Sequence, residues 1–407
     1  MIFFYLTDLL RSVFYCEQFM KITTQNFGDL ILLTKCALLE STEKIAFLTD
    51  VHQSYDGSGE ERIPLRDHAR QTLNYSYAAV KSEIAGMYND IYAGIRSEFA
   101  IPYVMERHAI PDLIDTDFIE FDTSSFKGYM PEKSLALIES KSGQTVVEIT
   151  EIGRYQVIDD EPVYIDGYRL DKKVTATNAT IIPIRRCIVD GDASNQINAL
   201  MFKPSLVFRV LDSPEYAHSD DPVQFNNEDV YFLPLLLNGD FIEITFNQRQ
   251  SIVDGDLGLI GQFTPWFNPQ TMKNMRLYIK GKSDFHEFKR WLYRRSGRLN
   301  AFWMPTYERN FNYISKGSTG ITVKNDNYVD ARNHIAIKSG EVWSAHTVTA
   351  KTLAGENVFL TLSPYPPAQV DKVCYLGLYR LNADEIQFNF KGKMIVEVTM
   401  PILELSP

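Results

Sequence analysis

Apolar and polar residues alternate along most of this chain in a way that predicts strands, with a helical period in only two places. Residues 71–77 (Gln-Thr-Leu-Asn-Tyr-Ser-Tyr) follow a period of two, as a strand does when one face covers a core. The period then changes, and apolar residues at helical spacing predict a helix over residues 81–97. Phe285, Phe288 and Leu292 predict a second helix. Each helix directly follows an alternating strand.

The segment between the first helix and the middle of the chain reads as strands and turns. Short apolar or alternating runs bounded by turn residues predict strands at residues 118–121, 134–139, 145–150, 176–183 and 185–189.

One arrangement of residues occurs twice, about 200 residues apart. In the first copy a helix with Ile91-Tyr92 leads to Phe99-Ala-Ile-Pro102, and in the second a helix with Leu292-Tyr293 leads to Phe302-Trp-Met-Pro305. The prolines are 203 residues apart, and Gly143 and Gly340, which end two further matching segments, are 197 apart. Solenoid repeats are ~20–50 residues long, so this spacing favours two related domains in tandem.

The expected fold class is therefore mainly β (β-rich α+β), with two related domains of β-barrel or β-sandwich type, each with one principal helix. The predicted division is an N-terminal segment or arm at 1–44, a first β-rich domain at 45–200 and a second at 201–407.

Composition and charge exclude several classes of protein. The 407 residues are 45% hydrophobic and 23% charged, which is typical of a globular chain and not of a disordered one. The formal net charge of −11 argues against binding to a phosphate backbone or to an anionic membrane surface. One run, residues 289–298, holds five basic residues in ten. It fits a contact with an acidic neighbouring subunit as well as it fits nucleic acid.

The residue types used for catalysis and metal binding are scattered. The four cysteines and seven histidines show no metal-ligand spacing, and no phosphate-binding or nucleophile motif occurs. Asp-Gly-Asp occurs at 190–192 and 254–256, where a turn is favoured over a calcium site. The acidic residues 159–161 are interpreted as a solvated loop. We therefore expect no metal, no cofactor and no enzymatic activity.

An aromatic group could bind sugar by stacking, although core or interface packing is the more common use of such residues in β-rich domains. Its members are Trp266, Phe267, Trp303 and Tyr307.

The first residues resemble a signal peptide only briefly. Met1-Ile-Phe-Phe-Tyr-Leu6 lacks a basic region before it, and charges at Asp8 and Arg11 interrupt the apolar run. No run reaches the ~18 apolar residues that span a bilayer. The expectation is a protein made in the cytoplasm without an export signal or membrane segment.

The second copy resembles a known family. The helix ending in Arg295-Ser-Gly-Arg298, followed by the strand Phe302-Trp-Met-Pro305, is similar to a motif of tail proteins from long-tailed bacteriophages. Residues 375–386 and 396–405 resemble the closing strands of such proteins. The similarity is greatest to distal tail proteins, which form the ring between the tail tube and the baseplate or tip.

This resemblance implies a structural protein of the virion tail tip, made in the host cytoplasm and assembled as a ring homo-oligomer. Its implied partners are the tail tube protein and the tail-tip hub or fibre proteins, with no membrane and no sequence-specific nucleic acid. The expected subunit contact comprises Arg294, Arg295, Arg298, Phe302, Trp303 and Pro305. The alternatives are a carbohydrate-binding tail adhesin that uses Trp266 and Trp303, and, less favoured, a cell-wall hydrolase.

Overall fold

The fold is mostly β, as the sequence predicts. The computed structural model describes residues 20–35, 37–38, 41–57, 59–80, 82–158, 161–198, 200–216, 222–232, 243–254, 256, 258–266, 270–308, 310–325, 332–392 and 394–405. Strands make up 58% and helices 9%, with two α-helices in the described part, so β-rich α+β is confirmed. The sheets do not close into a barrel.

The described part of the first half, residues 20–210, contains one α-helix. Its elements are β1 (Met20–Thr24), β2 (Gly28–Leu32), β3 (Thr42–Ala46), β4 (Thr49–Gln53), β5 (Glu60–Pro64), β6 (Arg70–Ser76), β7 (Ala79–Val80), α2 (Ser82–Gly94), β8 (Phe99–Pro102), η1 (Val104–Glu106), β9 (His108–Ala109), β10 (Leu113–Glu120), η2 (Thr123–Ser125), β11 (Ser134–Ser140), β12 (Gly143–Ile158), β13 (Glu161–Ala176), β14 (Thr180–Val189), β15 (Ser194–Ile197) and β16 (Met201–Val210).

The described residues of the second half also contain one α-helix. Its elements are β17 (Gln224–Phe225), β18 (Glu228–Val230), β19 (Glu243–Asn247), β20 (Ser251–Val253), β21 (Gly261–Phe263), β22 (Gln270–Lys280), α3 (Lys282–Arg295), β23 (Phe302–Pro305), β24 (Tyr313–Lys316), β25 (Gly320–Lys324), β26 (His334–Ser339), β27 (Val342–Ala354), β28 (Asn357–Ser363), β29 (Lys372–Leu381), β30 (Glu385–Phe390) and β31 (Ile395–Glu404).

Both helices lie where the helical period predicts them. Met87 and Ile91 of α2, and Phe288 and Leu292 of α3, are buried against the sheets of their own halves. The helix α3 ends at Arg295 and is capped by Ser296, which has a left-handed backbone and donates its N–H to the carbonyls of Leu292 and Tyr293.

One strand prediction was wrong in its boundaries. The expected strands 176–183 and 185–189 are instead the end of β13 and the single strand β14. The two are separated by a turn in which Asn178 has a φ of 48°. Asparagine tolerates this conformation because its side chain is short and polar.

The two halves use the same scheme of strand pairing. In the first half β2 runs parallel to β8, and β8 pairs with β14, β14 with β16, and β16 with β6. In the second half β18 runs parallel to β23, and β23 pairs with β29, β29 with β31, and β31 with β22. A smaller set of strands extends each of these sheets. In the first half β14 pairs with β11, and β11 with β12, just as in the second half β29 pairs with β26, and β26 with β27.

Strand pairing also shows where the expected segments lie. Although β1 and β2 fall within the predicted arm at 1–44, β2 pairs with β8 and so belongs to the first-half sheet. Strand β16 pairs with first-half strands alone among the described strands, so that half extends to Val210, past the boundary expected at residue 200.

One antiparallel sheet crosses from one half to the other. Its order is β15–β16–β6–β3–β30–β31–β22–β19. Strand β3 joins the halves, because it pairs with β6 on one side and with β30 on the other. At its two ends, β15 and β19 each have one neighbour among the described strands.

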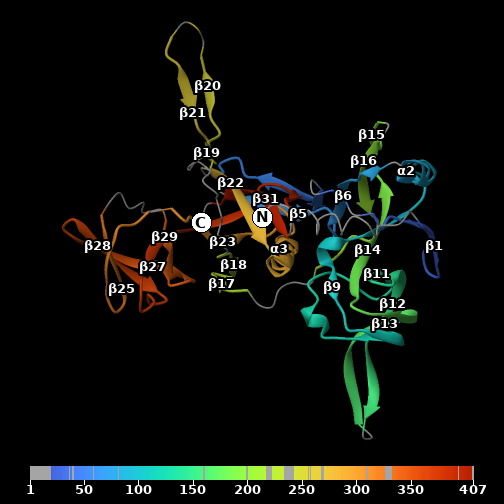
Figure 1. The fold of residues 1–407 in the computed structure, drawn as a ribbon. Coiled ribbons are helices and arrows are strands. Elements are labelled where there is room, and N and C mark those ends of the chain that lie inside the picture. The colour runs from blue at the N-terminus through green and yellow to red at the C-terminus, as the bar shows by residue number, and fades with distance from the viewer. Residues whose placement is uncertain are drawn as a thin grey trace, which may run out of the picture.

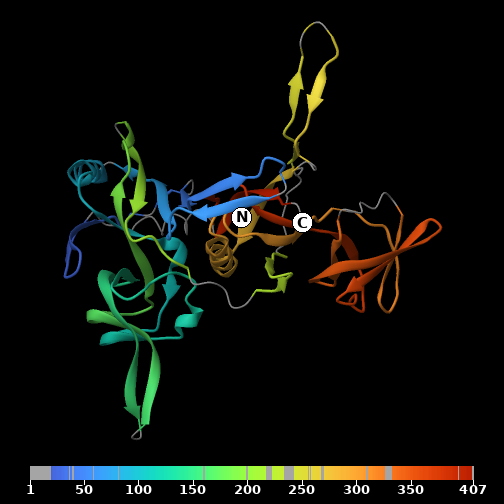
Figure 2. The same ribbon diagram turned by 180° about the vertical axis from the view of Figure 1, so that it is seen from behind.

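Two hairpins project from this body in opposite directions (Figure 1, Figure 2). One is formed by β12 and β13, and the other by β20 and β21. The residues of β20 and β21 are all exposed. A two-stranded hairpin has little stability of its own in water, so an exposed one of this kind suits a partner surface.

Candidate functional site: the junction of the two halves

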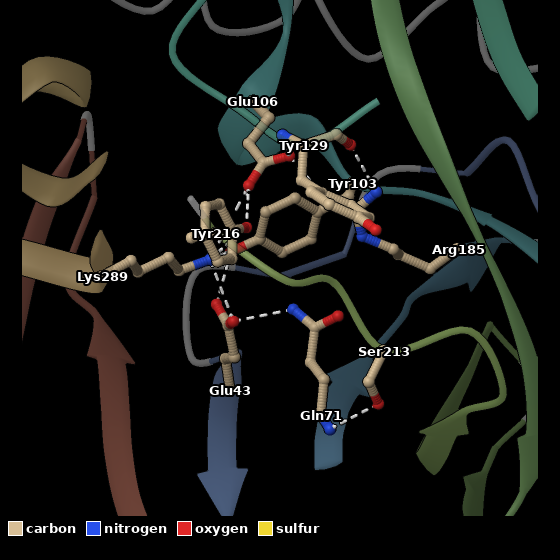
Figure 3. Close-up of polar contacts among 9 residues, drawn as sticks. All are labelled: Glu43, Gln71, Tyr103, Glu106, Tyr129, Arg185, Ser213, Tyr216 and Lys289. Atoms are coloured by element: carbon tan, nitrogen blue, oxygen red, sulfur yellow. Dashed lines mark hydrogen bonds and ion pairs between the residues drawn. The ribbon is translucent and has the colours of Figure 1, made fainter. Parts of the chain in front are cut away.

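Where the halves meet, a set of charged and phenolic side chains is buried (Figure 3). Its four charged members are Glu43 on β3, Glu106 in η1, Arg185 on β14 and Lys289 on α3, each almost completely hidden from solvent. Because two carboxylates and two cations are present, the formal charge of the cluster is zero.

Lys289 is the contribution of the second half to this junction cluster. Its Nζ lies 3.0 Å from a Glu43 carboxylate oxygen and 3.8 Å from Glu106. It also donates to the hydroxyl oxygens of Tyr103, at 2.8 Å, and Tyr216, at 3.2 Å. These contacts replace the water that the ammonium group loses on burial.

The other members complete the network from the first half and from the connecting segment. Tyr103 donates its hydroxyl to Glu43, and Tyr216 donates to Glu106. Arg185 donates to Glu106 at 2.6 Å and to the carbonyl of Tyr129 at 2.9 Å. Both carboxylates therefore accept from a cation and a phenol.

Burial raises the pKa of Tyr103 and of Tyr216 well above the usual value of 10, and the neighbouring carboxylates add to the effect. Both phenols therefore keep their protons and act as donors. For Arg185, burial acts to lower the pKa, but the charge of Glu106 and its neighbours outweighs burial and raises it. The two phenols therefore stay protonated, and Arg185 stays charged, throughout the neutral range.

This arrangement can hold the two halves together. Side chains buried to this extent are screened from solutes, and they come from β3, η1, β14, α3 and the segment after β16. Removing one charged member leaves a buried group of opposite charge without its counter-ion, which costs several kcal/mol. The junction cluster therefore stabilises the contact between α3 and the first half of the chain.

The arginine-rich segment predicted as a subunit contact binds acidic residues of its own chain. Arg294 and Arg295 both pair with Asp229, which lies on β18 and is buried. Arg295 also donates to the carbonyl of Ala301. Burial raises the pKa of Asp229, but the two guanidinium groups outweigh it and lower that pKa.

Arg298 fixes a second point of contact between the halves. It binds Asp384 at 3.0 Å and donates to the carbonyl of Thr49 on β4. Asp384 also accepts the Thr49 backbone N–H at 2.8 Å. The β4–β5 hairpin is held over the second half by these contacts and by Arg380, which pairs with Glu60.

The apolar members of the predicted contact are inside the molecule. Phe302, Trp303 and Pro305 form β23 and are buried between β18 and β29. The structure thus brings Arg294 and Arg295 together on Asp229, and places Arg298 at a separate contact. Only Arg294 and Arg298 retain a partly exposed side chain. That a second copy touches this segment stays a prediction.

The sequence analysis missed the acidic partners. Glu43, Glu106, Asp229 and Asp384 are all distant in sequence from the cations they bind. The one available signal was the match between Asp192 and Asp384 at equivalent places in the two copies.

The aromatic residues considered for sugar binding do not present open ring faces. Trp303 is buried, and Trp266 is covered by the β4–β5 turn, where a Cβ on Gly57 would lie 2.9 Å from its ring. Tyr307 packs edge-to-face on Trp343. Phe267 lies outside the described residues.

The scattered histidines and cysteines stay apart. Among the described residues no group of three or more His, Cys, Asp or Glu could hold a metal ion. Cys187 and Cys374 are buried free thiols, while Cys16 and Cys36 are outside the described part. In the first Asp-Gly-Asp segment, Gly191 has a φ of 84°, a turn conformation that glycine adopts readily. Asp190 of this segment binds Arg209. Residues 159 and 160 are also not described.

No helix in the described part of the chain is long and apolar enough to cross a bilayer.

No protein-family model matches this chain, and no curated protein matches it.

Proposed function

We propose that this protein is a structural component of a phage tail tip or baseplate, a ring-forming distal tail protein that links the tail tube to the tip complex. Support for the tail assignment comes from the resemblance of Arg295-Ser-Gly-Arg298 and Phe302-Trp-Met-Pro305 to the tail-protein motif. In the structure this segment joins α3 to the central strand β23.

The observation that supports a role in assembly is that both end strands of the antiparallel sheet have an open edge among the described strands. Strands β15 and β19 each have a second edge without a partner among the described strands. Apolar side chains are exposed beside both, including Ile197, Phe246 and Ile252. Exposed strand edges and apolar side chains are liabilities in a monomer and are typical of surfaces that bind protein.

Negative-stain electron microscopy with a parallel measurement of solution mass tests this proposal. Closed rings of uniform diameter, at a mass that is a fixed multiple of 46.7 kDa, are expected. A monomer at all concentrations that binds glycans would overturn the proposal in favour of the tail adhesin. Measurable hydrolysis of peptidoglycan would instead support the cell-wall hydrolase.

A further inference from the structure

The shared pairing scheme assigns each strand of one half an equivalent in the other. Strand β3 pairs with β6 as β19 pairs with β22, so Glu43 corresponds to Ile244 and Ile45 to Phe246. Strand β15 pairs with β16 as β30 pairs with β31, so Asn195 corresponds to Phe388. The buried faces of the helices match in the same way, Ile91 with Leu292.

Within one chain, two of these strands meet edge to edge. Glu43 on β3 lies opposite Phe388 on β30, in an antiparallel pair. Glu43 and Ile45 are fully buried in this pairing. Glu43 binds Lys289, which lies on the face of α3 that meets the first half. Tyr293, one turn further along α3, is 9% exposed.

The equivalent surfaces at the two ends of the sheet are uncovered. Phe246 is 73% exposed where its counterpart Ile45 is 0% exposed. On α2, Tyr88 and Tyr92 correspond to Lys289 and Tyr293, and Tyr92 is 77% exposed. The rings of Tyr88 and Tyr92 stack 6.4 Å apart on this open face.

We infer that a second copy of this chain covers these surfaces, in a contact that repeats the junction of the two halves. Strand β19 of one copy pairs antiparallel with β15 of the next, and Ile244 and Phe246 pack on the tyrosine face of α2. The register follows from the equivalence: Ile244 lies opposite Asn195, and Thr245 opposite Ser194. This inference rests on the proposed ring and names its interface.

The residues that differ between the junction and the sheet ends differ as a pair. In the junction, Glu43 faces Lys289, an acid against a base. At the sheet ends the corresponding residues are Ile244 and Tyr88, so both charged side chains are replaced together by uncharged ones. A solitary carboxylate against a tyrosine face would be costly, whereas this pair is compatible with burial.

The same equivalence predicts where the projecting β20–β21 hairpin lies in the assembly. It follows β19 as the β4–β5 hairpin follows β3. Because β4–β5 lies over the second half, bound by Asp384 and Arg298, β20–β21 is positioned to lie over the first half of the next copy. Asp192, the counterpart of Asp384, is exposed there.

A contact between β19 and β15 joins different patches of identical chains. Such a head-to-tail contact closes into a ring when the rotation between copies divides a full turn, and otherwise produces a filament. The antiparallel sheet then continues from one copy to the next.

Intermolecular disulfide cross-linking tests the register. Two variants, Ile244→Cys and Asn195→Cys, are mixed and oxidised, so that the cross-linked pair can form only between copies. Residues directly opposite on antiparallel strands have Cβ atoms ~4.5–5.5 Å apart, close to what a disulfide requires. A dimer is expected from this pair and not from Ile244→Cys mixed with Thr352→Cys, on an exposed position of β27. Absence of the dimer overturns the proposed register.

A disruptive substitution separates this inference from the proposed function. Phe246→Asp should abolish the oligomer and leave the circular dichroism and melting of the chain unchanged, because Phe246 is exposed. Leu353→Asp, at a similarly exposed apolar residue of β27, should assemble normally. Rings that persist in Phe246→Asp would overturn this interface while the ring function stands. Cross-linking of Ile244 to Asn195 in open filaments would support the interface and contradict the ring.

Discussion

At the residue scale, this protein buries several charged side chains inside the fold. Lys289, Arg185 and Arg295 are all nearly inaccessible, and each binds a buried carboxylate. Buried ion pairs cost free energy to desolvate, so their main consequence is that neither partner can be lost alone. By its sequence the arginine-rich run suits a contact with another subunit. In the structure its arginines instead form ion pairs with carboxylates of their own chain.

Arg295→Ala is expected to destabilise the monomer by about 3–5 kcal/mol, because Asp229 loses a buried partner and the Ala301 carbonyl loses its donor. Urea denaturation measures the change. Arg209→Ala removes an exposed pair with Asp190 and should cost about 1 kcal/mol or less. Equal stabilities of the two variants would contradict the internal role of Arg295.

Protonation of the half-buried His286 should limit stability in acid. Burial lowers the pKa of His286 to about 4, below its usual 6.5. Between these values the unfolded chain binds a proton that the folded chain does not, so the free energy of unfolding falls as the pH drops from 6.5 to 4. Thermal melting of His286→Gln should therefore change less between pH 7 and pH 5.

The matched control is His52→Gln, at an exposed position on β4. It should retain the full loss of melting temperature in acid. A wild-type response in His286→Gln would show that other groups, such as the half-buried His334 and the buried His346, carry the pH dependence.

At the element scale, the sequence predicted which segments are helical and strand-forming better than where each strand ends. The helix expected over 81–97 is α2 (Ser82–Gly94), because apolar periodicity reports directly on the buried face. The strand expected over 176–183 was misplaced, because the same apolar run contains the end of β13, a turn and the start of β14.

A glycine in β13 should be essential for its pairing with β10. A Cβ on Gly167, where φ is 151°, would lie 2.1 Å from the carbonyl oxygen of Ile119. Gly167→Ala is expected to destabilise the fold by about 1–3 kcal/mol through this overlap. Gly143→Ala has a similar φ of 140° and open space, so it isolates the conformational cost.

Denaturation midpoints of the two glycine variants give the comparison. In addition, hydrogen exchange of the β10 amides should increase in Gly167→Ala and stay unchanged in Gly143→Ala. Equal exchange in both would show that the β10 backbone accommodates the added methyl group.

At the scale of the whole molecule, the junction cluster and β3 should make the two halves unfold together. All four tryptophans, Trp266, Trp291, Trp303 and Trp343, lie in the second half, so their fluorescence reports mainly on that half. Hydrogen exchange in β6 and α2 reports on the first half. In the wild-type chain both probes should give the same urea midpoint.

Lys289→Met should separate these midpoints and lower stability by about 3–5 kcal/mol, because it leaves two buried carboxylates with one fewer cation. Adding Glu43→Gln should recover part of the loss. Lys44→Met, which removes an exposed pair with Glu385 from the same strand, is the control. Coincident midpoints in Lys289→Met would mean that β3 and the contacts of the β4–β5 hairpin are enough to couple the halves.

Sequence by itself determined the strand-rich composition, the two helices and the matching segments about 200 residues apart. Each of these depends on the local order of apolar, polar and turn residues, which a linear pattern records. Part of the candidate site was also visible, since Arg294, Arg295 and Arg298 were selected for their unusual charge density.

Only the tertiary structure decided what those arginines bind and which sheet edges remain open. Asp229 lies 66 residues from Arg295, and Glu43 lies 246 residues from Lys289. Pairing over such separations depends on how sheets stack, which no local period encodes. The same reason hides from the sequence that β3 is covered by β30 whereas β19 is exposed, although both strands occupy equivalent places in their halves.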